Sequence, residues 1–375
     1  MPSKLWVALL GRRDRPTDGV EDYCTFLGQA LEQRNVRLQL VRVAWDEKGW
    51  IGAFTELRRE SVRWRGRWVL LQYTALSWSR RGFPFRALAA LRILRRGGAR
   101  VAVVFHEPHR QDYSPGWIHR VRGASQDWVI RRLYAGAEKC IFTDPLEKIG
   151  WLPSGDKKSA FIPIGANIPE APPGLEGHAA QNGAARTVAV FGVTEYPIRE
   201  REREIADISH AVRVATTNGV KMRVLFVGRG TGEAAEAIKS AFREIPADVS
   251  ILGLLSAGEV SKQLAESHAM LFVRGRIQAR RGSVMAGIAC SLPIVGYAGA
   301  AEGTPLGEAG VELVRYGDRD ALGAAVTHVL TDANLRRALR EKSVRAQRKY
   351  FSWDAIAATF VRSLEAGVSG ASAGN

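Results

Sequence analysis

The sequence predicts an α/β protein built from two domains, each with a doubly wound parallel sheet. Short apolar runs alternate with segments of helical periodicity along most of the 375 residues. A stretch rich in Gly, Pro and Ala interrupts this alternation between 165 and 185. A second series of strands and helices begins directly after the interruption, at 188, which indicates a second domain of the same class.

In the first half of the chain, the expected strands are short, apolar and separated by segments long enough for helices. They lie at 5–10, 36–43, 68–73, 101–105, 140–143 and 161–164. The clearest helix begins near Gly19, where Val20, Tyr23, Leu27 and Leu31 fall on one face at helical spacing. Buried strands joined by helices predict a parallel sheet with helices on both faces.

The second half repeats this layout after the interruption. Strands are expected at 188–192, 222–228, 249–253, 269–273 and 292–297. We therefore predict an N-terminal domain at 1–165, a linker at 166–187 and a C-terminal domain at 188–350. A last helix at 351–366 is expected to return to the N-terminal domain, and the small, polar tail at 367–375 is expected to be disordered.

Composition limits the classes of function. The formal net charge of +16 predicts anionic partners, such as nucleotide phosphates, nucleic acid or anionic membranes. Cys24, Cys140 and Cys290 lie far apart in apolar surroundings, which indicates buried thiols in a reducing compartment. The chain runs from Met1 directly into a predicted strand, and no apolar run reaches membrane-spanning length. We therefore expect a cytoplasmic protein without a signal peptide.

The stretch 280–295 has the layout of an anion site. Arg280 and Arg281 precede Gly282 and Ser283 between two predicted strands, and a helix of small residues follows. We expect Ser283 to cap this helix at its N-terminus. Free N–H groups and the helix dipole favour an anion there, and two guanidiniums can hold phosphate oxygens. The alternative is a basic surface loop before an ordinary helix.

Several segments, taken in order, resemble glycosyltransferase family 4, whose members have the GT-B fold. The resemblance spans nearly the whole chain. It implies two Rossmann-like domains facing a central cleft, and transfer of a sugar from a nucleotide-diphosphate donor with retention of anomeric configuration. It rests on Gly19-Val-Glu-Asp-Tyr, Phe161-Ile-Pro-Ile-Gly-Ala-Asn, Val188-Ala-Val-Phe-Gly, Val224-Leu-Phe-Val-Gly-Arg-Gly, Ile251-Leu-Gly, Ala289-Cys-Ser-Leu-Pro-Ile-Val and Phe351-Ser-Trp.

Two departures from the family pattern concern the donor site. The paired glutamates of the family align with Gln278 and Ala286, so both carboxylates are missing. The two cations that grip the diphosphate in the family align with Val193 and Arg199, so only the second is kept. We expect the basic loop at 280–283 to compensate. The expected donor-binding residues are Gly19, Arg199, Arg229, Gln278, Arg280, Arg281, Gly282 and Ser283.

His106 and Glu107 directly follow a predicted strand, at the edge where open α/β sheets bind ligands. In the resembling family a histidine near this point touches the donor sugar, so both residues are candidate catalytic groups. The alternative is a loop pair that caps the next segment. His109 is nearby, but no third ligand is spaced for a metal, so no metal is expected. Asp318-Arg-Asp320 is expected to cap a helix.

Residues 78–96 form a second unusual region, because arginines alternate with aromatic residues and leucines. The leucines are expected on one side of a helix, and Arg92, Arg95 and Arg96 towards another. Such a helix suits an anionic membrane surface and equally suits a solvated basic face. No nucleic-acid-binding module is recognisable, so no nucleic acid is expected as a partner.

These features and the resemblance predict a metal-independent hexosyl- or related glycosyltransferase without a cofactor. It is expected to act on a membrane-linked glycan or lipid acceptor in the synthesis of a cell-envelope polysaccharide. Guanidiniums and helix N–H groups are expected to stabilise the leaving diphosphate. Two alternatives stay open: a nucleotide-sugar epimerase of the same fold, and a catalytically inactive nucleotide-sugar-binding subunit. If residues 78–96 bind lipid, we expect the protein to attach peripherally to the inner face of the membrane.

Overall fold

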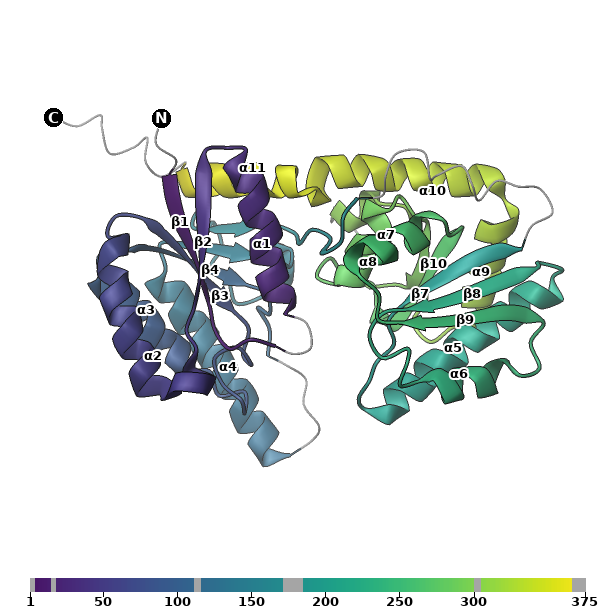
Figure 1. The fold of residues 1–375 in the computed structure, drawn as a ribbon, viewed down its shortest axis with the longest axis horizontal. Helices are drawn as coiled ribbons and strands as arrows, with labels where there is room; N and C mark the ends of the chain where they lie inside the picture. The colour runs from purple at the N-terminus through teal and green to yellow at the C-terminus, as the bar shows by residue number, and fades with distance from the viewer. Residues whose placement is uncertain (1–3, 15–17, 111–115, 171–184, 300–304, 366–375) are drawn as a thin grey trace. The chain divides into compact units, whose positions relative to one another are not determined.

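The computed structural model describes residues 4–14, 18–110, 116–170, 185–299 and 305–365. The chain divides into two compact units: unit 1 is residues 1–164 with 353–375, and unit 2 is residues 165–352. Each unit holds one six-stranded sheet covered by helices (Figure 1). The predicted α/β class with two doubly wound parallel sheets is confirmed. Most of the predicted linker, and all of the predicted disordered tail, lie outside the described residues.

The sheet of unit 1 has the order β2-β1-β3-β4-β5-β6, and all neighbouring strands are parallel. Side chains alternate between the two faces of a strand. One face of β1 therefore packs with α2, α3 and α4, and the other packs with α1 and α11. The elements are β1 (Lys4–Leu10), α1 (Gly19–Glu32), β2 (Val36–Arg42), α2 (Trp45–Ser61), β3 (Trp68–Tyr73), α3 (Arg86–Arg96), β4 (Arg100–Phe105), α4 (Trp117–Gly136), β5 (Lys139–Phe142), β6 (Ser159–Phe161) and α11 (Trp353–Glu365).

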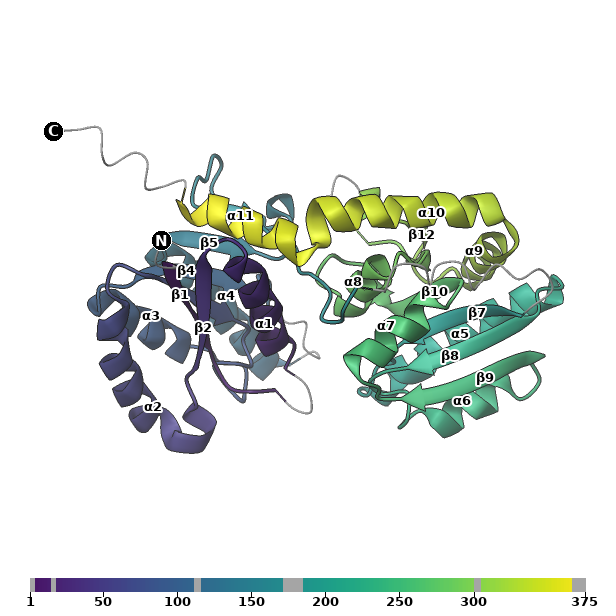
Figure 2. The ribbon, with the colours of Figure 1, turned by 45° about the horizontal axis from the view of Figure 1, so that its top comes forward.

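The last helix belongs to unit 1. Trp353, at the start of α11, stacks on Phe26 of α1 with the ring centroids 5.7 Å apart. Figure 2 shows α11 beside α1 and the strands of this unit. The apolar face of α1 holds Tyr23, Leu27 and Leu31, as the helical spacing predicts, and all three are buried.

The sheet of unit 2 has the order β12-β11-β10-β7-β8-β9, again fully parallel. Numbered from the first strand of the unit, this is the Rossmann order, with the order reversing between β7 and β10. The elements are β7 (Arg186–Phe191), α5 (Ile198–Thr217), β8 (Met222–Val227), α6 (Ala235–Phe242), β9 (Ala247–Gly253), α7 (Ala257–Ala265), β10 (Ala269–Arg276), α8 (Gly282–Ala289), β11 (Ile294–Tyr297), β12 (Val311–Val314), α9 (Arg319–Thr331) and α10 (Ala333–Ala346).

The strands β7 and β10 separate towards their carboxyl ends. They pair only through Val188 with Ala269 and Ala189 with Met270, although both strands continue beyond these pairs. In an open α/β sheet, the point of reversal is where ligands bind, outside the carboxyl ends of the strands. The chain therefore places the loops that follow β7 and β10 at the expected ligand-binding edge of unit 2.

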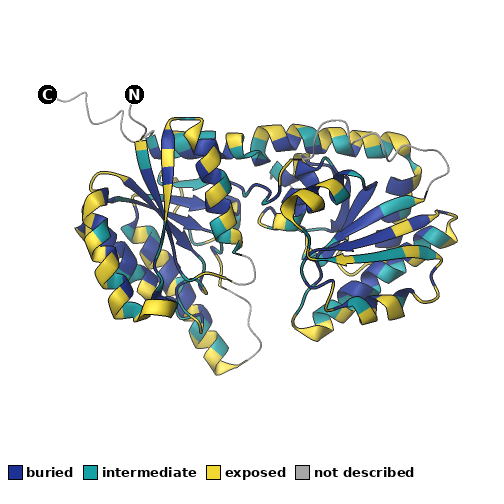
Figure 3. Ribbon diagram, viewed as in Figure 1, coloured by how far each residue is buried: buried dark blue, intermediate teal, exposed yellow. Residues whose placement is uncertain are grey.

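Two strands differ from the sequence-based expectation. β6 lies earlier than the expected 161–164, where Pro163 has no N–H to donate to a strand ladder. β12 was not expected, because its four residues are all half-buried and give no apolar run. Figure 3 shows that the central strands of each sheet are mostly buried.

Candidate functional site

Three arginines gather where β10 ends and α8 begins. Arg274 lies on β10, and Arg280 and Arg281 directly precede α8. A Cβ atom on Gly192, in the loop after β7, would lie 3.0 Å from Nη1 of Arg274, so this guanidinium reaches across to that loop. Gly192 has φ of +79°, a conformation that other residues adopt only with strain. Glycine here therefore allows the guanidinium to approach the backbone closely.

Two guanidiniums of the arginine cluster, those of Arg274 and Arg281, are only partly satisfied by the protein. The Nε atoms of Arg274 and Arg281 are buried, and neither has an acceptor within the described part of the chain. Burial, followed by the charges of Arg280 and Arg274, lowers the pKa of Arg281, and Glu204 opposes this shift. Glu204 is itself buried and accepts hydrogen bonds from the N–H and Oγ1 of Thr194, at 2.8 Å and 2.6 Å. An anion would neutralise the remaining charge.

The helix α8 begins beside these arginines without a side-chain cap. Arg281 is the N-cap residue, and its side chain has no acceptor atom to offer. The Arg281 carbonyl accepts from Val284 and Met285. The N–H groups of Gly282 and Ser283 have no acceptor within the helix, so they can bind an anion. The prediction that Ser283 caps the helix is wrong, because α8 begins at Gly282 and places Ser283 inside its first turn.

In unit 1, His106 lies at the carboxyl end of β4. Its Nε2 is 2.8 Å from Oε1 of Gln72 on β3, and the amide nitrogen of Gln72 donates to the carbonyl of Leu70 at 3.2 Å. Tyr23 packs edge-on against the imidazole, 4.9 Å between centroids. Burial lowers the pKa of His106 to about 4, and Asp18 at the start of α1 opposes this shift. The imidazole is therefore neutral at neutral pH.

Known structures with the same architecture were found by comparison. Sucrose-phosphate synthase from Thermosynechococcus elongatus matches with a TM-score of 0.69 and 15% identity, over 98% of this chain and 100% of that chain. HepE from Anabaena, in complex with UDP-glucose, matches with a TM-score of 0.64 and 11% identity, over 96% and 99%. A glycosyltransferase from Rickettsia africae matches with a TM-score of 0.66 and 10% identity, over 99% and 100%.

The chain has the GT-B fold. At these identities the likeness establishes the fold and nothing finer. No protein-family model matches the sequence. A comparison with curated proteins gives no match either. What distinguishes this chain within the GT-B fold is the set of residues that it places at the ligand-binding edges of its sheets.

In unit 2, the predicted donor residues fall into three groups. Arg280, Arg281, Gly282 and Ser283 lie together at the start of α8, and Oε1 of Gln278 accepts from Nε of Arg280 at 3.1 Å. Arg229, in the loop after β8, forms an ion pair with Glu195 at 2.9 Å, so part of its charge is already neutralised. Arg199 is exposed in the first turn of α5, and it makes no ion pair with a described residue.

In unit 1, the GT-B fold brings Gly19 and His106 to one edge of the sheet. Gly19 is the first residue of α1, and Asp18 caps that helix by accepting from Val20 and Glu21. Asp18 also acts electrostatically on His106, so the start of α1 and the end of β4 share one environment. Glu107 follows His106 in the same loop and is half-buried.

Sequence reasoning missed two residues of this site. Arg274 was hidden because it directly follows the apolar run of β10 and has no motif of its own. Glu204 lies inside a charge-rich run at the start of α5, a pattern typical of a solvated helix face, yet it is only 2% exposed. A polar residue at the carboxyl end of a buried strand was the available signal for Arg274, since ligands bind at that edge.

The structure gives no candidate metal centre in the part of the chain that it describes. His109 lies 4.0 Å from Asp144, without a third ligand. Asp318 caps α9 by accepting from the N–H of Ala321 at 2.9 Å, and Asp320 lies 2.7 Å from Nε2 of His210. The prediction that Asp318-Arg-Asp320 caps a helix is confirmed. The three cysteines are free and buried, as predicted.

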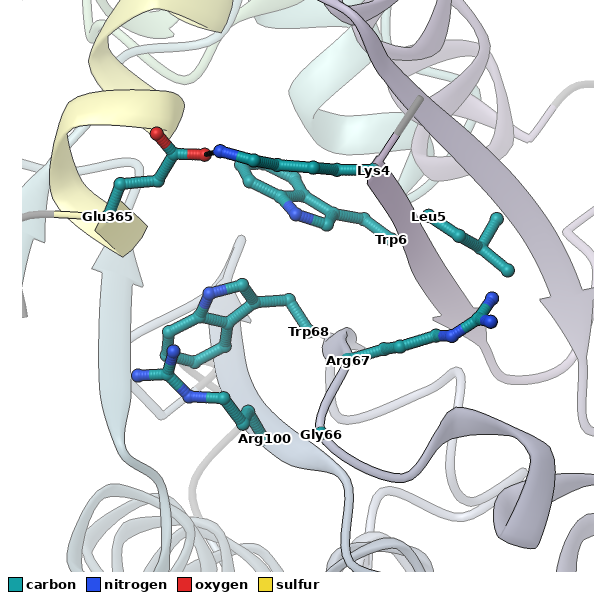
Figure 4. A pocket seen from close by; sticks show the side chains of 8 residues that line it. All are labelled: Lys4, Leu5, Trp6, Gly66, Arg67, Trp68, Arg100 and Glu365. Carbon is teal, nitrogen blue, oxygen red and sulfur yellow. Dashed lines mark hydrogen bonds and ion pairs between the residues drawn. The ribbon is translucent and has the colours of Figure 1, made fainter. Parts of the chain in front are cut away.

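A cavity of about 520 Å³ lies at the opposite edge of the unit 1 sheet, at the beginnings of β1, β3 and β4 (Figure 4). An ion pair between Lys4 and Glu365 closes one side of it. His106 and Gly19 lie at the other edge, so this cavity is not part of the candidate site. Its lining residues are Lys4, Leu5, Trp6, Gly66, Arg67, Trp68, Arg100 and Glu365.

Proposed function

We propose that the protein is a glycosyltransferase that moves a sugar from a nucleotide-diphosphate donor to a membrane-linked glycan or lipid. The arginine cluster carries the proposal. Arg274 and Arg281 have buried, unpartnered Nε atoms beside the uncapped start of α8, at the reversal point of a Rossmann sheet. Guanidiniums and free helix N–H groups together favour phosphate oxygens. Structures of similar fold support this reading, since HepE of Anabaena is described in complex with UDP and glucose and with UDP-glucose.

In the proposed reaction, the acceptor hydroxyl oxygen bonds to the anomeric carbon as the bond from that carbon to the diphosphate breaks. Negative charge develops on the leaving group, and the departing diphosphate takes up the hydroxyl proton. Arg274, Arg281 and the N–H groups of Gly282 and Ser283 stabilise that charge, which makes a metal ion unnecessary for this step. Retention of configuration is part of the proposal. The resemblance to glycosyltransferase family 4 supports it, as does the similar trehalose-6-phosphate synthase structure, described in work on glycosyltransfer with retention.

We assign His106 the role of accepting a hydrogen bond from a hydroxyl group of the substrate. Because Gln72 presents an acceptor to Nε2, the neutral imidazole carries its proton there and leaves Nδ1 as an acceptor. Such a group orients the sugar and acts chiefly in the transition state. Glu107 is the second candidate for this role, because it lies in the same loop.

A catalytically inactive nucleotide-sugar-binding subunit is the second candidate function. Gln278 and Ala286 stand where the resembling family carries its paired glutamates, and Ala286 is buried in α8. Proteins of this fold also include nucleotide-sugar epimerases. The sugar product distinguishes an epimerase from a transferase. The first experiment is a thermal-unfolding screen with UDP-, GDP- and ADP-glucose. Binding to the folded state raises the stability by about 2.7 kcal/mol when the ligand exceeds its Kd one-hundredfold, and no shift with any donor would contradict both functions.

A further inference from the structure

The outward face of α4 carries apolar side chains where a helix on a sheet normally carries polar ones. Trp117, Val121, Ala124 and Trp128 are spaced so that all four share one side of the helix. Trp117 is 69% exposed, Val121 52% and Trp128 47%, and Ala124 is also exposed. We call these four residues the α4 stripe. The opposite side of α4, which includes Val129 and Leu133, is buried against the sheet, so the stripe is additional to the core (Figure 3).

Arginines flank the α4 stripe on both sides. Arg120, Arg131 and Arg132 are exposed, and the only acidic residue of α4 is the half-buried Asp127. The Arg132 guanidinium lies 5.4 Å from the ring centroid of Trp128. Phe85, itself 48% exposed, packs against the same ring with the centroids 6.0 Å apart. The surface is thus an aromatic and aliphatic strip bordered by cations.

Residues 78–96, for which the sequence left a membrane surface and a solvated basic face open, have no free apolar face. Trp78, Leu91 and Leu94 are at most 4% exposed and belong to the core of unit 1. What residues 78–96 offer to solvent are mainly arginines, among them Arg92, Arg95 and Arg96, together with Phe85 next to the α4 stripe. In the described part of the chain, no helix is long and apolar enough to span a bilayer.

We propose that unit 1 docks on an anionic membrane surface through the α4 stripe and its flanking arginines. Exposed tryptophans favour the boundary between lipid headgroups and acyl chains, and arginines extend from that depth to lipid phosphates. The mixture of side chains on a single helix face fits a membrane better than nucleic acid, because Val121 and Ala124 add aliphatic surface that neither phosphate contacts nor base stacking uses.

Docking through the α4 stripe extends the proposed function. It rests on that function for one point only, the class of acceptor. α4 follows β4, so its N-terminal end lies on the side of the sheet where β4 ends at His106. A protein docked through the stripe would hold that edge close to the lipid surface. A lipid-linked acceptor would therefore meet His106 without leaving the membrane.

The test is sedimentation of the full-length protein with vesicles, in the absence of any nucleotide. We expect binding to vesicles of phosphatidylcholine mixed with phosphatidylglycerol, weak binding to phosphatidylcholine alone, and release by salt. The variant Trp117→Ser/Val121→Ser/Trp128→Ser should reduce the bound fraction by about tenfold or more. The variant Arg120→Gln/Arg131→Gln/Arg132→Gln should lose the dependence on salt and on lipid charge.

Matched controls use exposed residues of the same kinds elsewhere in unit 1. Ile51→Ser/Val62→Ser removes two apolar side chains that are 87% and 60% exposed, and Arg92→Gln/Arg95→Gln/Arg96→Gln removes three exposed arginines of α3. Both should bind vesicles like the wild type. If the triple serine variant unfolds, Trp117→Ser/Val121→Ser replaces it.

Three results would overturn the docking surface: no binding of the wild type, unchanged binding of the stripe variants, or equal losses in the controls. Nucleotide binding by the same variants is measured separately by calorimetry. Because the α4 stripe belongs to unit 1 and the arginine cluster to unit 2, nucleotide affinity should not change. Wild-type protein that binds nucleotide but not vesicles would overturn this inference alone, whereas wild-type protein that binds vesicles but no nucleotide would overturn the proposed function alone.

Discussion

Oε1 of Gln72 lies 2.8 Å from Nε2 of His106, and this contact determines which hydrogen bond the histidine can offer. The amide nitrogen of Gln72 is directed to the carbonyl of Leu70, so the oxygen is the atom that faces the imidazole. A neutral His106 then keeps its proton on Nε2. It can accept a hydrogen bond at Nδ1 but has no second proton to donate.

Replacement of His106 tests its assigned role. His106→Ala should lower kcat by about 10²-fold while nucleotide affinity stays nearly unchanged, as expected for a group that acts in the transition state. Glu107→Gln is the matched comparison in the same loop. A larger loss of kcat in Glu107→Gln than in His106→Ala would transfer the role to the glutamate.

The pH dependence of stability provides a second test of His106. Its pKa in the folded protein is about 4, below the value of about 6.5 in an unfolded chain. Between these values the unfolded chain binds more protons, so the free energy of unfolding should fall as the pH falls from about 6.5 to about 4. His106→Gln should remove part of that fall in urea titrations at several pH values. An unchanged dependence in the variant would show that other groups cause it.

The arginine cluster predicts a phosphate-specific loss of affinity. Arg281→Ala should weaken binding of the nucleoside diphosphate by about 1.5–3 kcal/mol, the usual range for a lost charged hydrogen bond. The affinity for the nucleoside should hardly change. Arg223→Ala, an exposed arginine at the beginning of β8, is the control and should behave like the wild type in calorimetry. Equal losses for nucleoside and nucleoside diphosphate would move the phosphate away from this cluster.

Gly192 should be sensitive to a single methyl group. In Gly192→Ala, the new Cβ would lie 3.0 Å from Nη1 of Arg274 and 3.3 Å from the Arg229 carbonyl oxygen. We expect lower nucleotide affinity together with the cost of a left-handed conformation, about 1–2 kcal/mol. Gly219→Ala isolates that cost, because Gly219 has φ of +81° and open space around it. If the two variants bind nucleotide equally well, Arg274 does not depend on the Gly192 loop.

Hydrophobic periodicity was sufficient to predict the two sheets and the apolar face of α1, because burial of Leu27 and Leu31 is a local consequence of helical spacing. It also located the basic loop before α8. The predicted N-cap of that helix was wrong, because the chain enters the helix at Arg281, two positions before Ser283.

The remaining features depend on contacts that are distant in sequence. Glu204 is buried because the loop after β7 folds back to bond it through Thr194. The leucines of α3 face the core because α2 and α4 pack beside them, which the amphipathic pattern alone could not distinguish from a lipid-facing side. The α4 stripe was missed because α4 carries apolar residues on both faces, so its sequence shows little contrast between a buried and an exposed side.

The most direct measurement of the central claim follows a radiolabelled sugar supplied as UDP-, GDP- or ADP-glucose to the full-length protein with anionic vesicles that contain lipid extract. We predict that label from one donor moves to the lipid fraction as the nucleoside diphosphate is released in equal amount, and that Arg274→Ala/Arg281→Ala abolishes both. Label that stays in a bound but intact nucleotide sugar would contradict transferase activity and identify a binding subunit. Conversion to an epimeric sugar would identify the epimerase instead.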